Sequence, residues 1–97
     1  MAKQALFVLL KAKPGKDGDV EAFLKVGAKM SLDEPKTVTW YGLKMGPDTY
    51  GVFDTFDDEA GRDAHMNGEI AKALMAKATE LFSNELKIER MEILANK

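Results

Sequence analysis

The sequence predicts an α+β domain in which a four-stranded antiparallel sheet carries its helices on one face. Four extended apolar segments occur at residues 4–13, 36–45, 49–56 and 86–95. Segments with helical periodicity separate the first from the second and the third from the fourth. This order of strand, helix, strand, strand, two helices and strand is the ferredoxin-like split βαβ arrangement. A chain of 97 residues is expected to form one domain, over residues 1–97.

The first predicted strand, residues 4–13, is apolar on both faces and ends at Pro14-Gly15. One side carries Leu6, Val8, Leu10 and Ala12, and the other carries Ala5, Phe7 and Leu9. A strand that is apolar on both faces needs cover on both faces. The helices can supply only one of these covers.

The first helix is expected to begin at Asp17, whose side chain can cap it, and to end near Glu34-Pro35. The residue before a proline is disfavoured in a helix, which explains the predicted end. The inward stripe of this helix is expected to contain Val20, Phe23, Leu24, Gly27 and Ser31.

Residues 36–45 and 49–56 flank the turn signal Gly46-Pro47-Asp48 and predict a hairpin. If the three turn residues are unpaired, Met45 faces Thr49. The resulting register places Trp40 opposite Asp54, Val38 opposite Phe56 and Gly42 opposite Val52. A one-residue bulge would break this pairing. This hairpin is also apolar on both faces.

Two helices and a strand are expected in the last part of the chain. Asp57-Asp58-Glu59 supplies the cap and acidic first turn of a short helix through Met66, and Asn67-Gly68 ends it. A further helix is expected over residues 69–82. The strand over residues 86–95 alternates poorly, which is typical of an edge strand or of a strand exchanged with another chain.

The uncovered face of the predicted sheet favours a homodimer. Helices on one face would leave a hydrophobic patch on the other that exceeds what a soluble monomer tolerates. Two such sheets packed face to face about a two-fold axis would bury it. The alternative is a monomer with a few ordinary exposed aromatic residues.

Composition excludes several function classes. The net charge of −2 supplies no basic field for nucleic acid. With no cysteine and a single histidine, only a carboxylate-rich metal site remains conceivable, and we predict no metal site. The apolar run at residues 5–10 is too short to span a membrane and lacks a signal-peptide cleavage site, so we expect no membrane partner and a cytoplasmic location.

The stretch from Gly51 to Met66 resembles the antibiotic biosynthesis monooxygenase family, which includes the quinol monooxygenases. The resemblance is carried by Asp54 and Phe56 in the strand, then by Glu59-Ala60 and Ala64-His65-Met66 in the following helix. It implies two sheets packed into a dimeric α+β barrel and cofactor-independent oxidation of a small aromatic quinol-like or anthrone-like substrate by molecular oxygen. Many quinol monooxygenases carry Pro-Gly-Cys and then Tyr where this chain has Pro35-Lys36-Thr37 and then Trp40.

His65 and Asp54 are the candidate catalytic residues. His65 is the one side chain with an unperturbed pKa near neutrality, at about 6.5, so it is the natural general base. It can equally be stabilised by the dipole at a helix C-terminus. Asp54 lies among aromatic residues, where a carboxylate needs a raised pKa or a partner such as Arg62 or His65. Its alternative role is to cap the next helix.

The substrate-binding candidates are residues that could wall a pocket for a planar ring or hold its oxygen atoms: Trp40, Tyr41, Tyr50, Arg62 and Asn67. The aromatic residues could instead belong to the core, and Asn67 could cap a helix junction. No nucleotide-binding motif is present, and we expect no cofactor. The competing functions are a non-catalytic dimeric module that binds a small apolar ligand and an isomerase or lyase.

Overall fold

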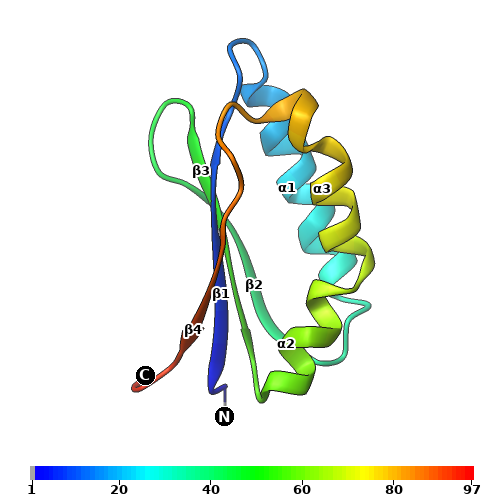
Figure 1. The fold of residues 1–97 in the computed structure, drawn as a ribbon, viewed down its shortest axis with the longest axis vertical. Coiled ribbons are helices and arrows are strands. Elements are labelled where there is room, and N and C mark those ends of the chain that lie inside the picture. The colour runs from blue at the N-terminus through cyan, green and yellow to red at the C-terminus, as the bar shows by residue number, and fades with distance from the viewer. Residues whose placement is uncertain (1) are drawn as a thin grey trace.

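The structure, a computed structural model, describes residues 2–97 and has the expected order of elements. Four antiparallel strands form one sheet in the order β2-β3-β1-β4, and the helices lie on one side of it (Figure 1). The ferredoxin-like α+β fold is therefore confirmed. The strands are β1 (Gln4–Lys11), β2 (Thr37–Lys44), β3 (Thr49–Phe56) and β4 (Ile88–Glu92), and the helices are α1 (Asp17–Ser31), α2 (Glu59–Met66) and α3 (Glu69–Leu81).

Helix α1 differs from its expected form at both ends. Lys16, not Asp17, occupies the N-cap position, and it makes no side-chain cap hydrogen bond. Asp17 instead lies in the first turn, where its charge favours the positive end of the helix dipole. The helix ends at Ser31, and tight turns carry the chain on to Pro35, with the amide of Glu34 donating to the carbonyl of Ser31. These turns carry Glu34 beyond the end of the helix.

The hairpin of β2 and β3 has most of the expected register. Trp40 lies opposite Asp54 and Gly42 lies opposite Val52, and the Met45 amide donates to the Thr49 carbonyl at 2.7 Å. The expected pairing of Val38 with Phe56 is wrong. An irregularity between Thr37 and Thr39 places Thr37 opposite Phe56. A bulge of this kind leaves one residue unpaired and shifts the pairing of the residues beyond it by one position.

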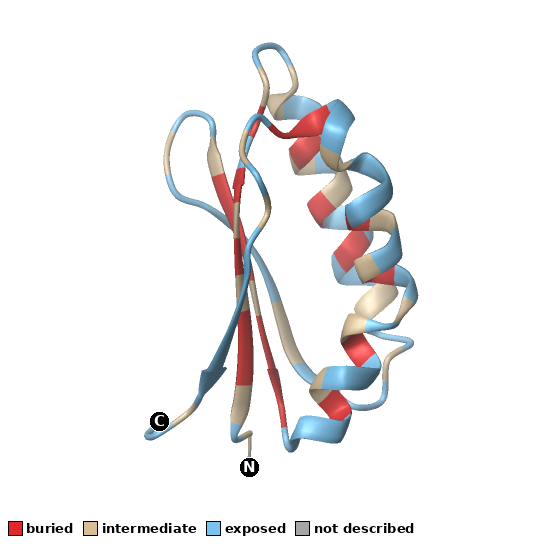
Figure 2. Ribbon diagram, viewed as in Figure 1, coloured by how far each residue is buried: buried red, intermediate tan, exposed pale blue. Residues whose placement is uncertain are grey.

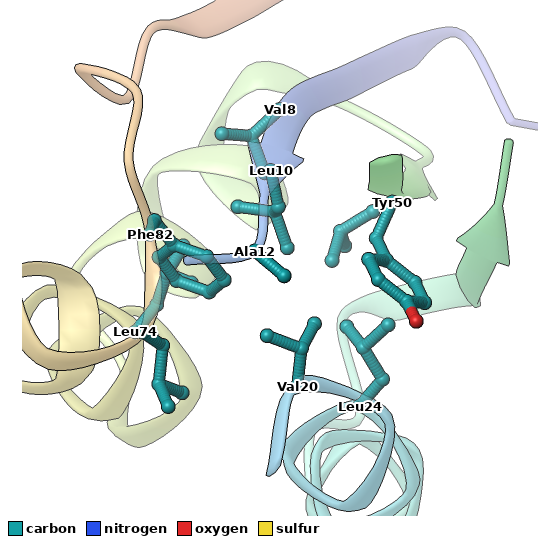
Figure 3. Packing of buried hydrophobic residues seen from close by; sticks show 10 residues of the cluster. Val8, Leu10, Ala12, Val20, Leu24, Tyr50, Leu74 and Phe82 are labelled. Atoms are coloured by element: carbon teal, nitrogen blue, oxygen red, sulfur yellow. The ribbon is translucent and has the colours of Figure 1, made fainter. Parts of the chain in front are cut away.

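The core fills the space between the sheet and the helices (Figures 2 and 3). Alternate residues of β1 and β3 point toward the helices, as the period of two requires. Helix α2 is fixed at its start by Asp58, whose side chain accepts from the Gly61 amide at 2.8 Å, as expected for an N-cap. The largest fully buried side chains are Tyr50, Phe56, Leu10, Val20 and Asp54. One of these five is a carboxylate.

The other face of the sheet carries apolar side chains with no helix above them. Tyr41 is 52% exposed, and its ring stacks on Phe53 at a centroid distance of 6.5 Å. Strand β4 forms one edge of the sheet, beside β1, and all of its residues are exposed. Among residues 2–97, no helix is long and apolar enough to cross a membrane.

Candidate functional site

Asp54 is a buried carboxylate on the helix-facing side of β3. It is 1% exposed and lies between Leu6 of β1 and Trp40 of β2 in the sheet register. The sequence alternation places it there because Tyr50, Val52 and Phe56 share its face and are all buried. A buried carboxylate is costly unless it is paired and hydrogen-bonded.

His65 supplies that partner from α2. Its Nε2 atom lies 2.9 Å from Asp54 Oδ2, and its ring packs against Phe56 with the ring centroids 5.3 Å apart. The ring is 8% exposed, and it lies near the C-terminal end of α2. The sequence predicts His65 or Arg62 as the partner of Asp54. In the structure this partner is His65.

The second ring nitrogen of His65 faces a carboxylate that the sequence did not single out. Nδ1 lies 2.7 Å from Glu34 Oε1, which also accepts a hydrogen bond from Thr37 Oγ1 at 2.8 Å. In the sequence, Glu34 precedes Pro35 and indicates only the expected end of a helix. The contact joins residues 31 positions apart, so neither periodicity nor a local motif could indicate it.

The protonation of His65 follows from these contacts. Burial disfavours the charged ring, but hydrogen bonds and charge attraction from Asp54 and Glu34 outweigh it and raise the pKa of His65 above 6.5. Two carboxylates at hydrogen-bond distance are best satisfied by a ring that donates from both nitrogens. Neither ring nitrogen is then available as a direct base.

An apolar cavity adjoins this cluster. Its walls include Asp54, His65 and Trp40 together with Leu6, Phe23 and Ile70. Its volume is about 40 Å³. This exceeds the minimum of about 10–15 Å³ that a cavity needs to hold one water molecule, whereas an aromatic ring needs a cavity of about 150 Å³. A ring can therefore enter only if the lining side chains move.

Two residues that line the cavity each carry a buried polar atom without a hydrogen-bond partner in the described part of the chain. Within residues 2–97, Asp54 Oδ1 and Trp40 Nε1 are both buried without a hydrogen-bond partner. Buried polar atoms normally have a partner in the protein or in water, so two such atoms, on residues that line one small cavity, point to a polar ligand or water that reaches them when the lining side chains move. A hydroxyl group could satisfy both, because it donates and accepts.

The remaining predicted site residues lie away from this cavity. Tyr41 is on the opposite face of the sheet, against Phe53. The Tyr50 hydroxyl donates to Glu21 at 2.6 Å and to Asp17 at 3.4 Å, which ties β3 to α1. Its ring is part of the core, the alternative considered for the aromatic residues.

Arg62 and Asn67 also serve other contacts. Arg62 Nη1 donates to Gln4 Oε1 at 2.7 Å, while its Nε atom is buried without a partner in the described part of the chain. Asn67 occupies the C-cap of α2, and its side-chain amide donates to the Asp63 carbonyl at 2.9 Å. This is the helix-junction role considered for Asn67. No group of three or more acidic or histidine side chains in residues 2–97 is arranged to hold a metal ion.

The fold and the buried carboxylate–histidine cluster define a small ferredoxin-like α+β protein with an apolar cavity beside the cluster. No known family model matches the chain, and no curated protein matches it in sequence. Proteins of known structure do share the fold. One is named provisionally as an antibiotic biosynthesis monooxygenase from Nitrosomonas europaea, at 13% identity and a TM-score of 0.83 over 95% of this chain and 90% of that one. Another with the same provisional name, from Chloroflexus aurantiacus, is 16% identical with a TM-score of 0.74 over 98% and 96% of the two chains. At these identities the likeness is one of fold.

A much nearer relative is the NE2512 protein of Nitrosomonas europaea, a protein of unknown function. It is 52% identical to this chain, with a TM-score of 0.95, over 100% of this chain and 94% of that chain. The chain belongs to the same family as the NE2512 protein.

Proposed function

We propose that the protein is a cofactor-independent monooxygenase that oxidises a small aromatic hydroxyl compound, of the quinol or anthrone type, with molecular oxygen. The observation that carries the proposal is the buried Oδ1 atom of Asp54, which has no hydrogen-bond partner among residues 2–97. Asp54 is one of the residues that line the apolar cavity, and His65 holds its other carboxylate oxygen. The provisional names of the two fold neighbours agree with this class of reaction.

The proton chemistry differs in one respect from the sequence expectation. His65 donates from both nitrogens, so Asp54, not His65, is the group that accepts the substrate proton. The hydroxyl proton passes to Asp54 Oδ1, and the Trp40 indole N–H donates to the resulting phenolate oxygen. Such a donor stabilises charge where it develops. His65 supports Asp54 through Oδ2 as a positioning residue.

The overall reaction balances without an added reductant. A hydroquinone and one oxygen molecule give a hydroxyquinone and one water, so one oxygen atom enters the ring and the other leaves as water. All the electrons come from the substrate, whose anion is electron-rich enough to reduce oxygen. The protein contributes an apolar pocket, a base and a donor.

The test is oxygen uptake by the purified protein with hydroquinone, methylhydroquinone and anthrone, corrected for the rate without protein. We expect uptake by the wild type and a loss of about 10²- to 10⁴-fold for Asp54→Asn, because the variant lacks the base. Asp63→Asn, on the exposed side of α2, is the matched control and should retain the rate. Uptake that does not exceed the rate without protein, or that survives Asp54→Asn, would contradict the proposal.

A second candidate function is a non-catalytic module that binds a small ligand. The observation that favours it is that both ring nitrogens of His65 lie against carboxylates, at 2.7 and 2.9 Å, so the single histidine of the chain offers no free base. Binding of phenol, followed by calorimetry, without oxygen uptake from any of the three substrates would support this function over the first.

We also propose that the protein works as a homodimer in which the two sheets pack face to face. Tyr41, Leu43 and Val38 are exposed on β2, beside the stacked ring of Phe53. Contiguous apolar patches of this kind mark interaction surfaces. Sedimentation should give about twice the chain mass of 10.7 kDa at micromolar concentration. A folded monomer that stays soluble on dilution would contradict this assembly.

A further inference from the structure

Glu34 is held in place by its own local contacts. Its carbonyl accepts from the Thr37 amide at 3.1 Å, and its Oε1 atom accepts from Thr37 Oγ1 at 2.8 Å. The side chain is 20% exposed and lines a surface groove of about 450 Å³ together with Met30, Lys36 and Ile70. His65 and Ile70 line both this groove and the inner cavity, so these two residues lie between the two spaces.

The Glu34 carboxylate determines which atoms of His65 carry protons. A carboxylate can only accept a hydrogen bond, so the contact at 2.7 Å requires a proton on Nδ1. A neutral ring would then present a lone pair at Nε2 to Asp54 Oδ2, at 2.9 Å, and two acceptors would face each other. A ring with protons on both nitrogens avoids this conflict.

We propose that Glu34 is a positioning residue for the reaction at Asp54. By fixing a proton on His65 Nδ1, it makes the ring donate to Asp54 Oδ2 and leaves Asp54 Oδ1 as the acceptor without a protein partner among residues 2–97. The role in catalysis rests on the proposed function. The arrangement of protons does not, and it is tested separately.

The other charged groups near His65 do not substitute for Glu34. From the loop before β2, Asp33 and Lys36 line the groove, and from the start of α3, Glu69 lines it. Glu69 is strongly exposed and lies 3.7 Å from Lys72. On α2 itself, the guanidinium of Arg62 donates to Gln4 of β1. Across residues 2–97, the ion pairs of His65 are those with Glu34 and Asp54.

The experiment is a nitrogen-15 and proton NMR titration of the His65 ring in the wild type, Glu34→Gln and Glu69→Gln. The chain has one histidine, so the ring signals need no assignment by mutation. In the wild type, both ring nitrogens should be protonated at neutral pH. In Glu34→Gln, the side-chain amide can donate or accept a hydrogen bond, so Nδ1 of His65 no longer has to carry a proton. The midpoint of the His65 titration should then fall by about one pH unit or more.

Glu69→Gln removes the same charge from the same groove, and it should move the midpoint by less than about 0.3 unit because its charge is screened by solvent. Glu34→Asp keeps the charge with a shorter arm, so its midpoint should lie between those of the wild type and Glu34→Gln. It also provides the comparison if the Gln variant does not fold. A midpoint and nitrogen shifts that are unchanged in Glu34→Gln would overturn the proposal.

Turnover supplies a separate readout. With hydroquinone as substrate, Glu34→Gln should shift the pH–rate profile in the same direction as the His65 midpoint, while Glu69→Gln leaves the profile in place. A shifted His65 midpoint with an unshifted profile would refute the role of Glu34 in catalysis. Absence of oxygen uptake by the wild type would refute the proposed function and, with it, this catalytic role, but the NMR result would still decide the proton arrangement.

Discussion

Replacing His65 with Gln is expected to destabilise the protein by about 3–5 kcal/mol, the usual cost of removing one member of a buried ion pair. The His65 ring is 8% exposed, and its hydrogen bonds of 2.7 and 2.9 Å join two carboxylates from different parts of the chain. Gln carries its donors on a single nitrogen, so it cannot reach both. At least one carboxylate then loses its partner, and each hydrogen bond to a charged group is worth about 1.5–3 kcal/mol.

The pH dependence of this loss has a definite sign. The pKa of His65 is raised in the folded protein above its ordinary value of 6.5. The stabilisation by His65 is therefore fully present below about pH 6.5 and is lost as the pH rises through the folded pKa. One proton is involved, so the difference between wild type and variant can change by at most about 1.4 kcal/mol per pH unit.

The assay is urea denaturation of wild type and His65→Gln at a series of pH values from about 5.5 to about 9, spanning the window in which the linked proton dissociates. The difference in the free energy of unfolding should be largest at the acidic end and should shrink toward alkaline pH. A difference below about 1 kcal/mol near pH 6 would show that the cluster is not a buried ion pair. A difference that grows with pH would show that the pKa is lowered.

Three further predictions concern packing, binding and assembly. In Gly27→Ala, the new Cβ would lie 2.8 Å from Trp40 Cη2, so overpacking should cost about 1–3 kcal/mol and outweigh the gain in helix propensity. The control is Gly18→Ala, whose new Cβ would have nothing within 4 Å and which should not destabilise α1. Urea denaturation of both variants checks this. Trp40→Phe removes an unpaired buried donor together with ring volume that packs against Gly27, so the stability should fall and phenol binding measured by calorimetry should weaken. Tyr41→Glu should shift the sedimenting species from dimer to monomer while the circular dichroism spectrum stays that of a folded chain.

The fold could be predicted because its signals are local. Proline and glycine mark the ends of β1 and the hairpin turn, and periodicity separates strands from helices. The turn length alone placed Trp40 opposite Asp54. The predicted strand pairing is wrong beyond Thr39, where the structure has a bulge at Val38. This bulge has no hydropathy signature, because the residues on either side of it are apolar or β-branched with or without the bulge.

The site was only partly predictable, because it depends on how helices pack on the sheet. Asp54 and His65 were expected to be catalytic residues, and the structure brings them within 2.9 Å of each other. Which of the two would act as the base could not be inferred without Glu34, which contacts His65 from the loop after α1. The face of each aromatic residue follows from its strand register, which separates Trp40 from Tyr41. Trp40 and Tyr41, which are neighbours in the sequence, therefore lie on opposite faces of the sheet.

The small volume of the cavity is expected to limit the binding of an aromatic ring. Met66 lines the cavity beside His65 and Ile70, and it is half-buried. Met66→Ala removes every atom beyond Cβ and so enlarges the cavity without touching Asp54, His65 or Trp40. If the volume of about 40 Å³ limits ring entry, phenol should bind this variant more tightly than the wild type by about tenfold, the equivalent of about 1.4 kcal/mol.

Cyclohexanol is the control for this measurement, because it carries the same hydroxyl on a thicker ring. Its gain in affinity from Met66→Ala should exceed that of phenol, since the wild-type cavity excludes it more strongly. Enlarging an apolar cavity also destabilises the protein, so the free energy of unfolding of Met66→Ala should fall. Equal phenol affinity in the two proteins would mean that the wild-type side chains already move aside at little cost, and that the size of the cavity is not the barrier to ring binding.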